Sequence, residues 1–209
     1  MDVVQLVALG AGMAWASGLR LYAVLLAAGL LGRFGYLDLP AGLEVVQHPL
    51  VIGAAGLMFV LEFFADKIPA LDSMWDAVHT FVRIPAGAIL AALALGEYDP
   101  AVMLAAGLIG GSLAAATHAA KAGSRALINT SPEPFSNVVA SVGEDALVAG
   151  GLYAAFSHPY LFLALLGLFV LLLVWLLPKL WRGVKSVLAR ITGKGPGVKS
   201  GPSQPEGSF

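Results

Sequence analysis

Residues 160–177 form an apolar run of eighteen residues without a charged side chain. A helix needs about 20 mostly apolar residues to cross a hydrocarbon core of about 30 Å, so this run is close to a full span. Membrane β-barrels are excluded, because their strands alternate apolar and polar residues and this run does not. Charged residues make up only 12% of the chain, against about 25% in soluble domains. The sequence therefore predicts an all-α, polytopic membrane protein.

The apolar segments predict about six transmembrane helices, some of them kinked or broken, over residues 4–31, 49–64, 75–95, 101–120, 135–156 and 160–177. Lys and Arg concentrate in cytoplasmic loops near the ends of spans. With six spans, one side of the membrane receives most basic residues of the connections, namely Lys67, Lys121, Arg125, Lys179, Arg182, Lys185 and Arg190. We therefore expect a multi-pass protein of the cell (inner) membrane with both termini in the cytoplasm.

Composition divides the chain into three parts. We expect a helical membrane domain over residues 1–178, a basic amphipathic juxtamembrane helix over residues 179–192, and a disordered tail over residues 193–209. A shift of 110 residues aligns His48-Pro49 with His158-Pro159. This match indicates a possible internal repeat of the kind found in transporters, and chance similarity between apolar segments is the alternative. The chain has no cysteine, which excludes disulfides and cysteine metal sites.

Ionisable residues fall at helical spacing inside the third predicted span. Asp72, Asp76, His79 and Arg83 share one stripe of a helix that must begin before its apolar part to be long enough to cross. Pro85 is expected to kink this helix. Ionisable groups at bilayer depth cost several kcal/mol unless they face a polar interior or water, so the stripe is a candidate functional site.

Other predicted helices carry matching polar faces. The fourth predicted helix ends with a basic face, and the fifth begins with an acidic face. Arg20 lies in the middle of the first predicted helix, where Ser17-Gly18 can let the helix break. The candidate pathway or ligand-binding residues are Arg20, Glu62, Asp66, Asp72, Asp76, His79, Arg83, His118, Lys121, Arg125, Glu133, Asn137, Glu144 and Asp145.

Two interpretations of these charges remain open. They can line a functional cavity, or they can pair with one another and only fix how the helices register. No dense metal-binding spacing is present, so we expect no metal and no cofactor. Residues 124–137 contain Pro132 and Pro134, which forbid a continuous helix, and form either a re-entrant or gating loop or a polar linker.

The residues around the charged stripe also carry a resemblance. Residues 64–76, FADKIPALDSMWD, continuing through His79 to Arg83-Ile84-Pro85-Ala86-Gly87, resemble an uncharacterised integral-membrane family catalogued as domain of unknown function 4126. The stretch Ser131-Pro132-Glu133-Pro134 with Ser136-Asn137 is similar to the second signature of that family. The resemblance covers residues 4–177 and implies a multi-span, bacterial-type membrane protein. It implies no activity, substrate or catalytic residue.

The leading hypothesis is a small transporter or channel that moves an ion or small polar solute through an intramembrane polar cavity. The first alternative is a membrane-embedded enzyme, acting on a lipid or isoprenoid head group with Asp72, Asp76 and His79. The second alternative is a structural or assembly protein whose charges merely pair. Expected partners are the lipid bilayer and the transported ion or solute, and whether the chain forms a homo-oligomer is left open. Nucleic acid is not expected, because the net charge is −1 and no basic domain exists.

Overall fold

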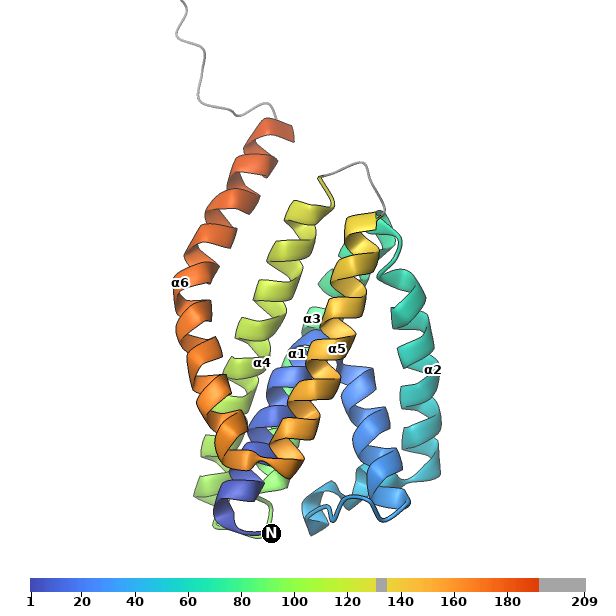
Figure 1. Cartoon of the computed structure of the whole chain (residues 1–209), viewed down its shortest axis with the longest axis vertical. Coiled ribbons are helices and arrows are strands. Elements are labelled where there is room, and N and C mark those ends of the chain that lie inside the picture. The colour runs from blue at the N-terminus through green and yellow to red at the C-terminus, as the bar shows by residue number, and fades with distance from the viewer. Residues whose placement is uncertain (131–134, 192–209) are drawn as a thin grey trace, which may run out of the picture.

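The computed structural model describes residues 1–130 and 135–191, and within them the chain is a bundle of helices without strands (Figure 1). Its elements are α1 (Val3–Arg33), the 3-10 helix η1 (Ala41–Gln47), α2 (Pro49–Ala65), α3 (Pro69–Ala94), α4 (Pro100–Ile128), α5 (Phe135–Ser157) and α6 (Pro159–Ile191). Within the described part, five helices are long and apolar enough to cross a membrane, or six if η1 and α2, bent by 63°, count as one span. The predicted all-α, multi-pass class is confirmed.

Side-chain caps and prolines set where several helices begin. The Asp2 carboxylate accepts a hydrogen bond from the backbone N–H of Gln5 at 2.7 Å and closes a capping box at the start of α1. The Asp99 carboxylate caps α4 in the same way, by accepting from the N–H of Ala101 at 2.8 Å. Pro100 follows at the first helical position, where its missing N–H costs no hydrogen bond.

Helix α1 is broken at Arg20, whose φ of −144° and ψ of 70° are not helical. Figure 1 shows the two arms as a hairpin: one rises from the N-terminus to the break, and the other returns to the same end of the bundle. Close approaches agree, because a Cβ added at Gly10 would lie 3.0 Å from Ala94 Cβ, and one added at Gly42 would contact the backbone of Leu93. The first arm of α1 and η1, the element that follows the second arm, therefore both lie beside the end of α3. The predicted break is confirmed, whereas the hairpin was not predicted.

The hairpin changes the topology. The N-terminus and the end of α6 lie at opposite ends of the bundle (Figure 1), which departs from the prediction of both termini on one side. That prediction counted α1 as a full crossing. Neither arm alone has the ~20 residues that a straight crossing needs. The hydropathy of an apolar segment does not distinguish a helix that crosses the membrane from a hairpin that returns to the same side.

Other boundaries also differ from the prediction. Helix α4 continues to Ile128 and α5 begins at Phe135, so both ends of the predicted re-entrant or linker segment over residues 124–137 are helical. Helix α3 runs without a break through Pro85, where a kink was expected. Helix α6 passes through Pro178 to Ile191, which makes the predicted juxtamembrane helix a continuation of the last span. The predicted tail over residues 193–209 lies outside the described residues.

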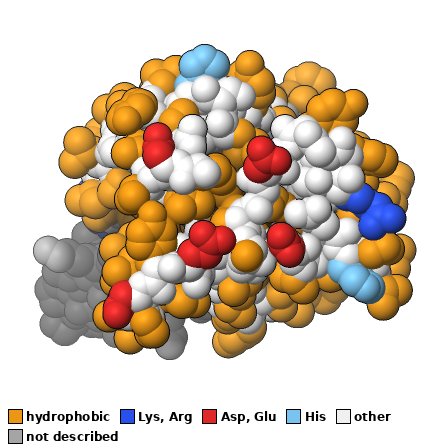
Figure 2. All heavy atoms as spheres, turned by 90° about the horizontal axis from the view of Figure 1, so that it is seen from below, with side chains coloured by type: hydrophobic (Ala, Val, Ile, Leu, Met, Phe, Trp, Pro, Cys, Tyr) orange, Lys and Arg blue, Asp and Glu red, His pale blue; other side chains and the backbone are white. Residues whose placement is uncertain are grey.

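The two ends of the bundle differ in charge. The end that carries the N-terminus shows several acidic side chains and little positive charge (Figure 2). The connections at that end contain Asp2, Arg33, Asp38, Glu44, Glu97 and Asp99. The opposite end contains Lys67 and the basic part of α6, with Lys179, Arg182 and Lys185.

Packing around the break of α1 leaves no room for larger residues. A Cβ added at Gly18 would lie 2.8 Å from Thr117 Cβ and 3.0 Å from the backbone N of His118, both in α4. We expect Gly18→Ala to lower the midpoint of thermal unfolding in detergent by several degrees, because overpacking costs about 1–3 kcal/mol. Gly143→Ala in α5 is the control, since nothing lies within 4 Å of its added Cβ. An equal response of the two variants would contradict this close contact.

Candidate functional site

Charged side chains from five helices meet inside the bundle, where α2 and α4 end, where α3 and α5 begin, and beside the break of α1. We call this set the buried charge cluster. Most of its side chains are at most 3% exposed, and Arg20, Glu62, Asp66, Asp72 and Arg83 are fully buried. The cluster consists of Arg20, Glu62, Asp66, Asp72, Asp76, Arg83, His118, Lys121, Arg125, Asn137, Glu144 and Asp145.

Arg20 joins α1 to α2 and α5. Its guanidinium forms an ion pair with Asp66 of α2, and its Nε lies 2.9 Å from a carboxylate oxygen of Asp145 in α5. Its Nη2 also donates to the Ser141 hydroxyl at 2.8 Å and to the Ser141 carbonyl at 3.2 Å. The helix break thus places a fully buried cation against two other helices.

Arg83 joins α3 to α2 and α4. It pairs with Glu62, and its Nη1 donates to Asp76 at 2.7 Å and to Nδ1 of His118 at 3.2 Å. An arginine can only donate, so Nδ1 of His118 accepts, and the network assigns the ring proton to Nε2. That nitrogen lies 2.7 Å from the Thr80 hydroxyl. His118 is therefore neutral in this arrangement.

Lys121 lies at the centre of the cluster. Its ammonium donates to the backbone carbonyl of Leu19, exposed by the break of α1, at 3.1 Å. Carboxylate oxygens of four side chains surround it at 3.4–3.8 Å, from Glu144, Asp66, Asp76 and Glu62.

Arg125 connects α4 to α5. Its Nε and Nη2 bind both oxygens of Glu144 at 2.9 and 3.0 Å, the bidentate arrangement that arginine favours. Its Nη1 donates to the side-chain and backbone oxygens of Asn137, both at 3.1 Å. Asn137 in turn donates to Asn129, whose amide donates to Asp72 at 3.2 Å.

Two residues of the predicted stripe do not join the ion pairs. Asp72 accepts from the Asn129 amide, and no ion pair to it is found among the described residues. His79 bonds the carbonyl of Trp75 through Nδ1 at 2.8 Å and stacks on the Trp75 ring, with centroids 4.2 Å apart. Its other ring neighbour is Tyr22. Glu133, also predicted for the site, lies outside the described residues.

Sequence reasoning missed two groups of the site. Thr80 was overlooked, although it lies four residues after Asp76 and so on the same helical face. The carbonyl of Leu19 was not identified as a specific ligand, since a side-chain pattern does not report which backbone oxygen a break exposes. Lys67 lies at the edge: it donates to the Phe63 carbonyl at 2.8 Å, and burial, followed by repulsion from Arg20, lowers its pKa.

The charges of the cluster do not balance. It contains six acidic side chains, Glu62, Asp66, Asp72, Asp76, Glu144 and Asp145, and four basic ones, Arg20, Arg83, Lys121 and Arg125. Four buried carboxylate oxygens have neither a hydrogen-bond donor nor an ion pair in the described part of the chain: Glu62 Oε2, Asp66 Oδ1, Asp72 Oδ1 and Asp76 Oδ2. Buried polar groups are normally satisfied, so these oxygens are candidate ligand atoms.

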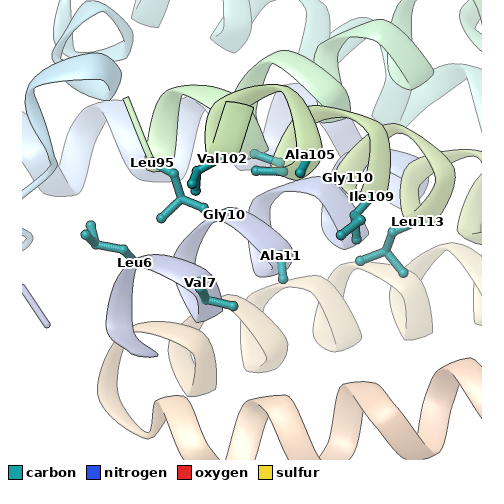
Figure 3. Close-up of a pocket in the computed structure, with 12 residues that line it drawn as sticks. Leu6, Val7, Gly10, Ala11, Leu95, Val102, Ala105, Ile109, Gly110 and Leu113 are labelled. Atoms are coloured by element: carbon teal, nitrogen blue, oxygen red, sulfur yellow. The ribbon is translucent and has the colours of Figure 1, made fainter. Parts of the chain in front are cut away.

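Most of the cluster is buried, and its partly exposed edge lies on α5, where the side chains of Glu144 and Asp145 are 14% and 28% exposed. Four grooves open on the outer surface of the described bundle, and none of these four is lined by a residue of the cluster. One of them lies between α1, α3 and α4, where Leu6, Ile109 and Leu113 are among the apolar side chains that line it (Figure 3). With Lys121 in its place among the carboxylates, no group of three or more His, Asp or Glu side chains within the described residues could hold a metal ion.

Comparison with known proteins gives one match, which is to a protein-family model. The family model described as Domain of unknown function (DUF4126) matches residues 7–179. No curated protein and no solved structure matches the chain. The match includes every residue of the buried charge cluster.

Proposed function

Because the chain belongs to the family described as Domain of unknown function (DUF4126), a description without an activity, we propose its function from the buried charge cluster. We propose that the protein is a carrier that moves an ion or a small polar solute across the membrane at this cluster. The break of α1 inside the cluster is the observation that carries the proposal.

Broken helices that meet near mid-membrane are a recurrent way to build transporter binding sites, because they free backbone groups for a ligand. Here the break frees the carbonyl of Leu19 and places Arg20 among carboxylates of α2 and α5. Non-helical backbone at membrane depth is tolerated where protein buries it or where it lines a cavity. Charges that only fixed helix register would need no broken helix, so the break favours a ligand site.

The burial of Arg20, Arg83 and Lys121 at the centre of the cluster favours a carrier over an open channel. An open pore would present its charged side chains to a continuous aqueous path, whereas the grooves described above are apolar. A carrier instead exchanges closed and open arrangements around a buried site. In this proposal the ion pairs of Arg20 and Arg83 rearrange when the site opens.

The basic end of the bundle is proposed to face the cytoplasm. Lys67, Lys179, Arg182 and Lys185 lie there, and cytoplasmic flanks of membrane spans carry the excess of Lys and Arg. The cluster then lies in the cytoplasmic half of the membrane, and the acidic N-terminal end faces the opposite side.

Flux through liposomes tests the proposal. Purified protein is reconstituted and screened for movement of protons, Na⁺, K⁺, NH₄⁺, chloride and small polar solutes. We expect Glu62→Gln to slow the flux roughly tenfold or more, since a hydrogen bond to a charged group contributes about 1.5–3 kcal/mol and 1.4 kcal/mol is a factor of ten. Glu44→Gln, an exposed glutamate of η1, is the control and should match wild type.

A structural role is the second candidate, and the dense pairing of Arg20, Arg83 and Arg125 favours it. It predicts no flux of any cargo in the screen, together with loss of folded protein when pairs are broken. The enzymatic alternative has no comparable observation. Asp72 and His79 bind Asn129 and Trp75 instead of converging with Asp76 on a common point.

A further inference from the structure

The ammonium of Lys121 occupies a cage of five oxygens. One is the backbone carbonyl at the break of α1, and the others are carboxylate oxygens from three further helices or their caps: Glu62 in α2 and Asp66 directly after it, Asp76 in α3 and Glu144 in α5. Four structural elements besides that of Lys121 itself therefore contribute to one cation-binding point. Such convergence is what a built cation site requires, and here a tethered side chain fills it.

Lys121 is not bound tightly to any single carboxylate. Charge-assisted hydrogen bonds from nitrogen to carboxylate are about 2.7–2.9 Å long, whereas the four carboxylates lie 3.4–3.8 Å from its Nζ. Each carboxylate is also held by an arginine: Arg83 binds Glu62 and Asp76, Arg20 binds Asp66, and Arg125 binds Glu144. The arginines can therefore keep the cage assembled when the ammonium leaves it.

The cage also has spare capacity for positive charge. Three of its carboxylates keep a second buried oxygen without a donor among the described residues, namely Oε2 of Glu62, Oδ1 of Asp66 and Oδ2 of Asp76. Within the cage four carboxylates face four basic side chains, so departure of the Lys121 ammonium leaves one negative charge uncompensated. The two further carboxylates of the cluster, Asp72 and Asp145, lie outside the cage. Burying uncompensated charge is costly, so the site favours uptake of a cation.

We propose that this cage is a binding site for a small monovalent cation of about the size of ammonium, and that Lys121 occupies it as a tethered substitute in the closed state. Ca²⁺ binds oxygens at 2.3–2.6 Å and Mg²⁺ at 2.0–2.1 Å, so the wider cage suits a larger, singly charged ion. The inference rests on the proposed carrier function and names its cargo class: the cation displaces Lys121 when the site opens.

Replacing Lys121 by an uncharged residue tests the cage without any transport assay. Lys121→Met is purified in detergent, and its thermal unfolding is measured in NH₄Cl, KCl, NaCl and choline chloride at equal ionic strength. We expect NH₄⁺ and K⁺ to raise its unfolding midpoint by about 5 °C or more over choline, in a saturable way, because a ligand that binds only the folded state stabilises it. Na⁺, which is similar in size to Ca²⁺, should have a smaller effect. Wild type should respond by no more than about 1 °C, since its own ammonium fills the cage.

Lys67→Met is the matched control, because Lys67 lies outside the cage and binds the Phe63 carbonyl and ring. It should respond to the four salts as wild type does. In Lys121→Ala, ethylammonium is expected to stabilise better than choline, since it can re-enter the space left by the lysine stem.

Unfolding midpoints of Lys121→Met that are equal in all four salts would overturn the proposal. If the variant is recovered only as aggregate, the comparison becomes its monodisperse yield after purification in NH₄Cl and in choline chloride, and equal yields would also overturn it. Absence of flux in liposomes combined with cation-dependent stability would refute the carrier and leave the cation site standing.

Discussion

A cysteine introduced at Val3 is expected to react with a membrane-impermeant maleimide from the same side of the membrane as a cysteine introduced at Asp38. A cysteine at Lys185 should react only from the opposite side. The reason is the hairpin of α1, which returns the chain to the end of the bundle where it began (Figure 1). The natural chain has no cysteine, so each variant carries one reactive thiol, and Val3→Cys leaves the Asp2 cap intact.

Labelling is compared in sealed vesicles of the two orientations, with Glu97→Cys as a further reference for the acidic end. If α1 crossed the membrane, Val3→Cys would label with Lys185→Cys, whereas Asp38→Cys and Glu97→Cys would label together as before. The two topologies therefore differ in one result, the side of the membrane from which Val3→Cys is labelled. Labelling of Val3→Cys from the side of Lys185→Cys would contradict the hairpin.

Helix α1 illustrates which parts of the fold the sequence could predict and which it could not. Hydropathy and charge depletion are sufficient for an all-α membrane class, and Ser17-Gly18 before Arg20 was sufficient to predict a break. The direction of the chain after the break was not predictable, because it depends on where the second arm packs. In the structure Gly29 of the second arm packs closely against Val46 of η1 and Ile52 of α2, and these contacts have no local sequence signal.

The sequence predicted which ionisable residues share a helical face, but not which of them form ion pairs. Helical spacing placed Asp76 and Arg83 on one stripe and Lys121 and Arg125 on another, and these four do meet. Spacing does not report how deep each helix end lies or how it is rotated against its neighbours. For that reason His79, on the same stripe, instead stacks on Trp75, and the lysine at the centre could not be told from those at the edge.

Replacing Arg20 by methionine is expected to cost about 3–5 kcal/mol of folding stability, because removing one partner of a buried ion pair leaves an uncompensated charge. Arg20 is fully buried and contacts Asp66, Asp145 and both Ser141 oxygens, so the variant loses the cation that lies between these two carboxylates. Equilibrium unfolding in mixed detergent and denaturant measures the change. Arg33→Met, at an exposed arginine of the same helix, is the control and should differ little from wild type.

The double variant Arg20→Met/Asp66→Asn separates the lost charge from lost packing. If the cost comes from the unpaired Asp66 carboxylate, neutralising it should restore part of the stability, so that the double variant is more stable than Arg20→Met alone. If Arg20 served only to fill space, Asp66→Asn would add its own cost to that of Arg20→Met. A double variant less stable than Arg20→Met would therefore contradict the assignment of Arg20 as the counter-charge at the helix break.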